Sequence, residues 1–421
     1  MTTLSGIGTP AISQVTSAPV HQAPSIFLWA LLILLASAAW AGFNASTEQS
    51  TRTYPLDLDG WGHLALRLKS SGHHLALLFQ DPSLWKGAVV PFAFGLAYYI
   101  APFDESVLVL NVVLFALAAA ILFLGFYFLG AGRWPALLAV LFWVFYPPNR
   151  YVFGYYFAEP FLAFLSALLF VLIGLTILRT TPYRAAASGI LAGLLLLARA
   201  PYFLTVCGLP LLLGYHISEK RWRAACLFGV GFLVAFSPWT IRNYLAHGEL
   251  IPFTTEGGKV LFQGTYLAGD DAIWDALRRR PDFVEIEARE KGKSSIEQNH
   301  YWQALALQQI WQDPAGQLRL CVRKAIRFWT YLPEHSWVPN WKTALVAALS
   351  LVFAGVALVR LRHSLLVQMC ALWLGGLWVL HALIHAELRY NFPVLPMLFL
   401  LAVLGVRSLW FPNPRYSDGY K

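Results

Sequence analysis

Charged residues are scarce in this sequence. Asp, Glu, Lys and Arg make up 13% of its 421 residues, whereas hydrophobic residues make up 58% and 17 residues are Trp. So few polar groups could not cover the exterior of a soluble protein of this size, which excludes the soluble globular classes. The composition therefore predicts an integral membrane protein.

Other absences narrow the function. Of the four cysteines, only Cys321 falls outside the apolar segments, so no disulfide framework is expected. The sequence contains no P-loop and no Gly-x-Gly-x-x-Gly, and so no sign of nucleotide binding. Residues 1–25 have no charged side chain and thus lack the basic start of a signal peptide; we expect a disordered cytoplasmic tail.

The net charge of +9 points to membrane lipid as a partner. The basic residues are spread over loops, ends of apolar segments and one loop helix, without forming a continuous stripe. Nucleic acid binding needs such a stripe, so no nucleic acid partner is expected.

Apolar runs long enough to approach about 30 Å of hydrocarbon recur along the chain. The segment 87–101 is also apolar, but it is short and interrupted by Pro91, so we expect it to be interfacial or re-entrant. The expected fold class is an all-α polytopic membrane protein with about ten transmembrane helices. The expected spans are residues 26–43, 107–130, 134–148, 157–178, 185–199, 201–216, 224–241, 342–360, 364–384 and 392–410.

Lys and Arg residues in alternate short loops indicate the orientation, because cytoplasmic loops are enriched in both. They predict that both termini are cytoplasmic and that two long loops, 44–106 and 242–341, lie outside, the larger one between helices 7 and 8. The expected organisation is a disordered cytoplasmic tail, a transmembrane catalytic module that includes the first outer loop, an outer-loop domain, and C-terminal transmembrane helices with a cytoplasmic tail. These cover residues 1–25, 26–241, 242–341 and 342–421.

Two carboxylates, Asp57 and Asp59, lie in the first outer loop before an amphipathic helix expected over 60–70. Asp59 is placed either to cap that helix or to take part in catalysis. Asp57 has no capping role in the pattern, and a carboxylate near lipid has a raised proton affinity, which suits a general base. Alternatively the pair could hold a divalent cation, although two acids are a weak metal signal.

Four arginines, Arg150, Arg199, Arg242 and Arg389, fall at the expected outer ends of spans, where the positive-inside rule does not explain them. Snorkelling to the interface is one explanation for each. Together they predict a ring of cations around one external cavity, and the planar guanidinium fork suits a phosphate.

Other polar groups are expected near the same outer face. Glu159 begins an apolar helix and needs a partner, for which an arginine is the default. His385, Glu387 and Tyr390 flank Arg389 and are expected to support it. The spacing of His63, His73 and His74 matches no strong zinc pattern, so solvated interface residues are expected there.

The larger outer loop contains three expected helices, over 272–291, 295–312 and 316–332. The last alternates apolar residues with Arg319, Arg323, Lys324 and Arg327, as a basic helix lying on a membrane interface does. We expect this loop to cover the cavity, either selecting an acceptor or serving as a passive lid.

Several short motifs follow one another over most of the chain. The most specific is Ser237-Pro-Trp-Thr-Ile-Arg242-Asn243-Tyr244, and the others are Asp57-x-x-x-Trp61-x-x-Leu64-Ala65, Ala158-Glu159-Pro160, Leu197-Ala198-Arg199-Ala200-Pro201, Gly257-Gly258 with Gly264, and Arg389-Tyr390-Asn-Phe-Pro393-Val-Leu-Pro396. Together they resemble the polytopic C-type glycosyltransferases that use polyprenyl-phosphate sugars, in particular bacterial relatives of protein mannosyltransferases and of aminoarabinose transferase. In that family the acid of the first outer loop is the catalytic base, so the resemblance implies this role for Asp57. The family often has Asp-Glu there, whereas Leu58 follows Asp57 here and a second acid stands at 59, which leaves open which carboxylate acts.

The resemblance implies an inverting glycosyltransferase that moves a sugar from a polyprenyl-phosphate donor to a lipid, glycan or protein acceptor at the outer face. The alternatives are a lipid-linked sugar flippase or other transporter, an O-antigen-polymerase-like enzyme, and an inactive relative serving as a subunit. Transporters usually show internal repeats, of which the sequence has no convincing example, and the loop position of the acids favours catalysis.

Overall fold

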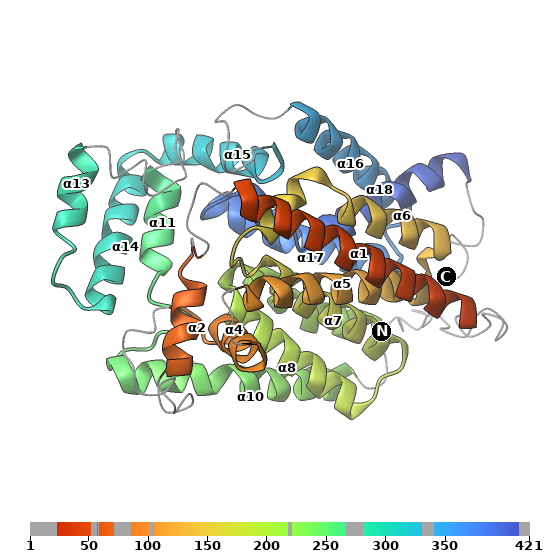
Figure 1. Ribbon diagram of the computed structural model, residues 1–421, viewed down its shortest axis with the longest axis horizontal. Helices are drawn as coiled ribbons and strands as arrows, with labels where there is room; N and C mark the ends of the chain where they lie inside the picture. The colour runs from red at the N-terminus through yellow and green to blue at the C-terminus, as the bar shows by residue number, and fades with distance from the viewer. Residues whose placement is uncertain are drawn as a thin grey trace, which may run out of the picture.

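The protein is an all-helical integral membrane protein over the residues described by the computed structural model, which are 23–51, 57, 59–70, 86–101, 105–217, 221–266, 281–330 and 341–411. The expected tail lies almost wholly outside them, as do His73 and His74. The α-helices, shown in Figure 1, are α1 Ala23–Thr51, α2 Trp61–Ser70, α4 Val89–Ile100, α5 Ser106–Phe126, α6 Arg133–Val144, α7 Glu159–Leu178, α8 Pro182–Ala198, α9 Phe203–His216, α10 Arg221–His247, α11 Gly257–Tyr266, α13 Pro281–Ala288, α14 Ser295–Gln312, α15 Pro314–Thr330, α16 Trp341–Arg360, α17 Leu365–Leu383 and α18 Leu395–Trp410.

A helix occupies each segment expected to span the membrane. Among the described residues six helices are long and apolar enough to cross a bilayer, namely those containing Ser25–Glu48, Ser106–Ala131, Glu159–Leu178, Arg221–His247, Trp341–Arg360 and Leu365–Leu383. The helices α6, α8, α9 and α18 are shorter, so the count of ten spans stays a prediction. The segment 87–101 is helical over Val89–Ile100.

Apolar side chains cover the outside of these helices. On α1, Phe27, Leu28, Leu31 and Leu35 are each exposed by more than half of their surface. Large exposed patches of this kind are unstable in water but favourable against lipid tails. The surface thus agrees with the membrane class that the composition predicts.

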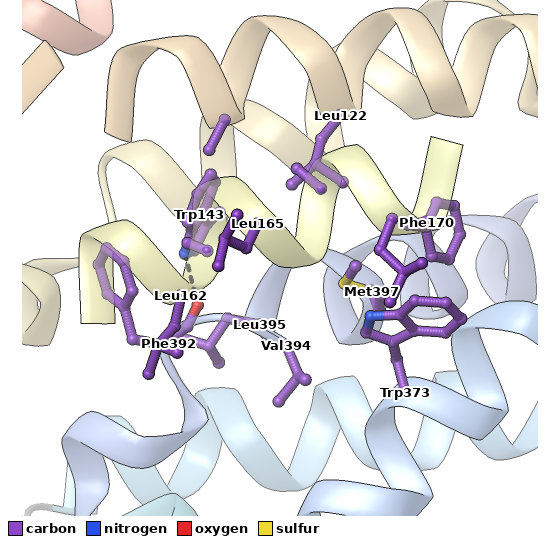
Figure 2. Close-up of a cluster of buried hydrophobic side chains, with 14 of the residues drawn as sticks. Leu122, Trp143, Leu162, Leu165, Phe170, Trp373, Phe392, Val394, Leu395 and Met397 are labelled. Carbon is purple, nitrogen blue, oxygen red and sulfur yellow. Dashed lines mark hydrogen bonds between the residues drawn. The ribbon is translucent and has the colours of Figure 1, made fainter. Parts of the chain in front are cut away.

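The core between the helices contains indoles that need hydrogen-bond acceptors. The Nε1 of Trp143 on α6 donates to the carbonyl of Phe392 at 2.9 Å, the bond drawn in Figure 2. The Nε1 of Trp373 on α17 donates to the hydroxyl of Ser166 on α7 at 2.8 Å. A buried N–H without a partner is costly, so these bonds specify which helices pack together. They fix α6, α7 and α17 around the segment that carries Arg389.

The helices α8 and α10 lie side by side, and glycine allows their close approach (Figure 1). A Cβ on Gly189 of α8 would overlap the carbonyl oxygen of Phe228, and one on Gly231 of α10 would overlap that of Ala186. Small residues at such positions let helix backbones pack tightly in a membrane. This contact holds α8 in place, and with it Arg199 at its C-terminal end.

The helices α11, α13 and α14, here called the loop subdomain, gather at one end of the molecule (Figure 1). They enclose a small core of their own, made by Phe262, Phe283, Trp302 and Ala306. Ser294 and Glu297 form a capping box that starts α14. The helix expected over 295–312 is thus confirmed. Of the stretch expected over 272–291, the described part is helical over Pro281–Ala288.

The helix α15 confirms the basic helix expected over 316–332, with one correction to its polar face. Lys324 is buried, and its Nζ donates to the carbonyls of Leu383 at 2.8 Å, Ile384 at 3.1 Å and Gly264 at 3.3 Å. Those carbonyls end α17 and lie in α11, where a positive charge complements the helix dipole. Lys324 therefore joins α15 to the loop subdomain and to α17, while Arg319 and Arg323 stay exposed.

We predict that Gly231→Ala destabilises the protein, because the added methyl group forces α8 and α10 apart. Overpacking of this kind costs about 1–3 kcal/mol. The matched control is Gly229→Ala on the same helix, where a Cβ meets no atom within 4 Å. Thermal unfolding of the purified protein in detergent should show a lower midpoint for Gly231→Ala only; equal midpoints for the two variants would refute the packing argument.

Candidate active site

The loop before α2 places two carboxylates in different roles. The carboxylate of Asp57 accepts the backbone N–H groups of Gly62 at 3.0 Å and His63 at 2.6 Å. Asp57 therefore caps the N-terminus of α2, the role that the sequence pattern offered to Asp59. The interpretation that Asp57 has no capping function is wrong. Gly60, with a φ of 73°, makes the turn that leaves Asp59 free to face elsewhere.

Asp59 forms a bidentate ion pair with Arg389, which lies 330 residues away along the chain. The two distances are 2.8 Å from Nη1 to Oδ2 and 3.1 Å from Nη2 to Oδ1. The indole Nε1 of Trp61 also donates to Oδ2 of Asp59, at 3.3 Å. Such a fork is the strongest geometry available to an arginine–carboxylate pair. It joins the first loop to the segment between α17 and α18.

The third guanidinium nitrogen of Arg389, Nε, also has carboxylate partners. Its Nε donates to Oε2 of Glu387 at 2.7 Å and lies 3.9 Å from Oε1 of Glu159. The guanidinium carbon stacks over the ring of Phe157 at 4.2 Å from its centroid. Because the side chain of Arg389 is 8% exposed, these partners, not water, neutralise it.

Glu159 and Arg199 form a looser pair beside the first. Nη2 of Arg199 lies 4.0 Å from Oε1 of Glu159, and the guanidinium stacks over the ring of Tyr390 at 4.4 Å. Glu159 is 1% exposed, yet neither carboxylate oxygen has a hydrogen-bond partner among the described residues. A buried carboxylate with ion pairs of about 4 Å and no hydrogen bond has unused acceptor capacity.

His385 and Glu387 lie in the same segment as Arg389, between α17 and α18, and hold its side chain in position. Nε2 of His385 lies 3.0 Å from Oε1 of Glu387, whose other oxygen receives Nε of Arg389. Burial would raise the pKa of Glu387, but Arg389 and His385 outweigh it and hold that pKa well below its ordinary value. Glu387 is thus an ionised support, and Tyr390 completes it by stacking against both arginines.

Lys86 and Glu256 also belong to this cluster, although the sequence reasoning did not single them out. Nζ of Lys86 lies 3.5 Å from Oε2 of Glu256 and 4.3 Å from the ring centroid of Trp61. The signal that could have found Lys86 is the one used for the arginines: a cation directly before an apolar segment, in a loop expected outside. Glu256 had no such signal, because only the tertiary fold brings the start of α11 to Lys86.

The charge balance of the cluster decides the state of Asp59. Burial would raise the pKa of Asp59, but Arg389, Lys86 and Arg199 lower it by more, so the pKa lies below its ordinary value. Burial likewise raises the pKa of Glu256, and Lys86 only partly offsets this. As the structure stands, Asp59 is an ionised partner of Arg389 and a weak base.

Two of the four predicted arginines come together, and two make other contacts. Arg199 and Arg389 share Glu159. Nη1 of Arg242 donates to Oδ1 of Asn243 at 2.9 Å, and its guanidinium lies over Trp239. Arg150 has a largely exposed side chain and pairs with Glu48 at 3.4 Å. The cluster therefore contains a pair of arginines and a lysine in place of the expected ring of four.

The centre is nearly closed. A cavity of about 10 Å³ lies between Glu159, Arg199, Tyr202, His381 and Tyr390, which is room for about one water molecule. This cavity is too small for a sugar phosphate as it stands.

A shared metal site at Asp57 and Asp59 finds no geometric support. One carboxylate is bound to the backbone of α2 and the other to Arg389. Within the described ranges, no group of three or more His, Cys, Asp or Glu side chains is arranged to hold a metal ion.

The fold and the site together define an all-helical integral membrane protein with a buried carboxylate–guanidinium centre. No protein-family model and no curated protein matches the sequence. Among solved structures, the chain is similar to the crystal structure of ArnT from Cupriavidus metallidurans bound to undecaprenyl phosphate, at 13% sequence identity and a TM-score of 0.36, over 93% of this chain and 78% of that one. That similarity is too low to assign a function to this chain.

We predict that Asp59 stabilises the protein at neutral pH and loses this effect in acid. Its pKa is depressed in the folded state, so the stabilisation is present above the ordinary carboxyl pKa of about 4 and is lost as the pH falls through the folded value. In thermal unfolding between pH 7 and pH 3, Asp59→Asn should lower the midpoint most at pH 7, and its curve should approach that of the native protein in acid.

The matched control is Glu285→Gln. It removes an exposed ion pair between Glu285 of α13 and Arg289, which directly follows that helix. Such pairs contribute about 0–1 kcal/mol, so the midpoint should hardly change. If Asp59→Asn behaves like this control at every pH, the pair with Arg389 does not contribute to stability.

Proposed function

We propose that the protein is an inverting glycosyltransferase that moves a sugar from a polyprenyl-phosphate donor to a lipid, glycan or protein acceptor at the outer face of the membrane. The observation that carries this proposal is the bidentate pair of Asp59 and Arg389, which places an acid from the first loop on a guanidinium in a nearly closed, buried centre. A carboxylate can serve in acid–base chemistry and the planar fork of a guanidinium suits a phosphate, so the centre contains both kinds of group.

Arg389, Arg199 and Lys86 are the proposed phosphate-binding groups. Arg389 presents a planar fork that now holds the two oxygens of Asp59, and two phosphate oxygens have a similar spacing. The looser pair of Arg199 with Glu159, at 4.0 Å, leaves its guanidinium able to turn toward an added anion. Cations in this apolar setting stabilise the charge that gathers on the leaving phosphate.

The donor is proposed to be borne by a lipid because the site adjoins the membrane helices. Glu159 begins a helix apolar enough to span the bilayer, and Arg199 follows α8. A sugar that is already activated on a polyprenyl phosphate reaches such a site through the bilayer. It needs no nucleotide at the point of transfer.

Asp59 is the proposed base, and Asp57 is proposed to position it. Asp57 uses its carboxylate to cap α2, whereas Asp59 is held only by side chains. When the donor phosphate takes the fork of Arg389, Asp59 loses the partner that depresses its pKa and becomes a stronger base. Binding of the donor thus frees Asp59 from Arg389, and Asp59 can then act as the base in the transfer of that donor's sugar.

Transfer then follows as one displacement. The acceptor oxygen or nitrogen forms a bond to the anomeric carbon while the bond from that carbon to the phosphate oxygen breaks. The electron pair of the broken bond stays on the polyprenyl phosphate, beside Arg389 and Arg199, and the acceptor proton passes to Asp59. Attack from the face opposite the leaving group inverts the anomeric configuration.

A transporter of lipid-linked sugars is the alternative. It is favoured by one observation, since the pair of Asp59 and Arg389 joins the first loop to the segment before α18 and could act as a gate. A transporter would move the donor intact, whereas the enzyme releases free polyprenyl phosphate. Product analysis separates the two.

We predict that Asp59→Asn strongly lowers the rate of sugar transfer, because an asparagine cannot take a proton. Asp57→Asn should retain most of the transfer, because the asparagine oxygen still accepts one of the two backbone N–H groups that Asp57 holds. Loss of a general base typically lowers the rate by about 10²–10⁴-fold. The assay uses purified protein in outward-accessible vesicles with a labelled polyprenyl-phosphate sugar. Transfer at the native rate by Asp59→Asn would disprove the assignment of Asp59 as the base.

We predict that Arg389→Lys weakens binding of the polyprenyl phosphate, because a lysine keeps the charge but not the planar fork. Arg150→Ala is the matched control, since Arg150 is largely exposed and pairs with Glu48 outside the centre. Binding is measured by competition with a labelled polyprenyl phosphate in nanodiscs. Equal affinities of Arg389→Lys and the native protein would remove the support for a phosphate clamp.

A further inference from the structure

A second, larger cavity lies between the loop subdomain and the segment that connects it to α10. Its volume is about 360 Å³, within the range of small-ligand sites. It is bounded by the segment 249–254, the first turn of α11 and the middle of α14. Neither the acid pair nor the arginines of the proposed active site line it.

The groups that line this cavity are uncharged amides and hydroxyls, one carboxylate, one imidazole and apolar side chains. Asn299, Gln303 and Thr254 supply neutral hydrogen-bonding groups, and Nε2 of His300 lies 3.2 Å from Oε2 of Glu249. None of the described lining residues is Lys or Arg. The cavity is thus poorly suited to a phosphate and well suited to a ligand with many hydroxyl groups.

Apolar groups complete the lining. Leu250, Phe253 and Leu261 face the same space as the polar groups. A pyranose ring has polar edges and two C–H faces, so it needs hydrogen-bonding groups and apolar contacts together. The lining provides both.

The walls of the cavity are held in place by partly buried hydrogen bonds. The backbone N–H of Gly258 donates to Oδ1 of Asn299 at 2.7 Å, and a Cβ on Gly258 would overlap the backbone of Asn299. On the other side, Nε1 of Trp239 donates to the carbonyl of Phe253 at 2.7 Å, and Nδ2 of Asn243 to that of Ile251 at 2.8 Å. A preformed site avoids the entropic cost of ordering its own walls on binding.

The cavity adjoins the proposed active site through Glu256. Thr254 and Gly257 line the cavity, and Glu256 between them pairs with Lys86 at 3.5 Å. Lys86 in turn stacks on Trp61, whose indole donates to Asp59. A chain of side-chain contacts therefore links one wall of the cavity to the acid that is proposed to act as the base.

We infer that this cavity binds a neutral sugar ring of the acceptor, so that the acceptor is a molecule that carries a glycan. This inference rests on the proposed transferase function, which requires an acceptor site next to Asp59. It also explains Arg242 and Asn243: their helix end holds the segment 249–254 that forms one wall.

The test is saturation-transfer NMR on the full-length protein in nanodiscs. The probes are glucose, galactose, N-acetylglucosamine and N-acetylgalactosamine, with inorganic phosphate added separately as a charged competitor. We expect at least one sugar to receive saturation, with no competition from phosphate. Gln303→Ala and Glu249→Gln should each weaken its binding about fivefold, the effect of one hydrogen bond.

Gln308→Ala is the matched control, because Gln308 is exposed on the same helix and does not line the cavity. It should bind the sugar as the native protein does. Absence of saturation for all four sugars, or equal binding by the cavity variants and the native protein, would overturn the inference.

The vesicle assay with labelled donor, run on the same preparations, separates this inference from the proposed function. Sugar binding that depends on Gln303 and Glu249, in a protein that releases no polyprenyl phosphate, would keep the sugar site and contradict the transferase. Release of polyprenyl phosphate without any sugar binding would keep the transferase and contradict the sugar site.

Discussion

The ion pair between Asp59 and Arg389 is the interaction on which the rest of the site depends. It is largely buried, bidentate and made by residues from opposite ends of the chain. Removing one charge from such a pair leaves the other uncompensated in an apolar setting, which is costly. We propose that an incoming phosphate takes the place of Asp59 on Arg389 at much smaller cost, so that the pair is stable alone and exchangeable in the presence of the proposed donor.

The packing of the surrounding helices would confine the proposed exchange of partners at Arg389 to side chains of the centre. Hydrogen bonds of buried indoles fix α6, α7 and α17 around the segment that carries Arg389, and glycine contacts hold α8 against α10. Lys324 joins α15 to the ends of α17 and to the loop subdomain. Against this frame, Asp59 lies in the turn between Asp57 and Gly60, and Arg199 pairs loosely with Glu159. Movement is therefore expected in the side chains of the centre and in the start of α2.

Much of this arrangement could be predicted from the sequence, because it follows from hydrophobicity. Long apolar runs located the helices, and charges that those runs do not explain located Glu159, Arg199 and Arg389. The roles of Asp57 and Asp59 could not be predicted, since capping depends on which carboxylate the turn at Gly60 directs toward α2. Lys86 and Glu256 were missed because their pairing joins segments 170 positions apart in the chain. The separate contacts of Arg150 and Arg242 likewise depend on tertiary structure.

The exchange of partners at Arg389 can be observed directly by infrared difference spectroscopy of the protein in nanodiscs, recorded before and after addition of a polyprenyl phosphate. The account predicts a shift of a carboxylate stretching band that is present in the native protein and absent in Asp59→Asn. An identical difference spectrum for the two proteins would show that the phosphate leaves Asp59 on Arg389, and would contradict the central claim.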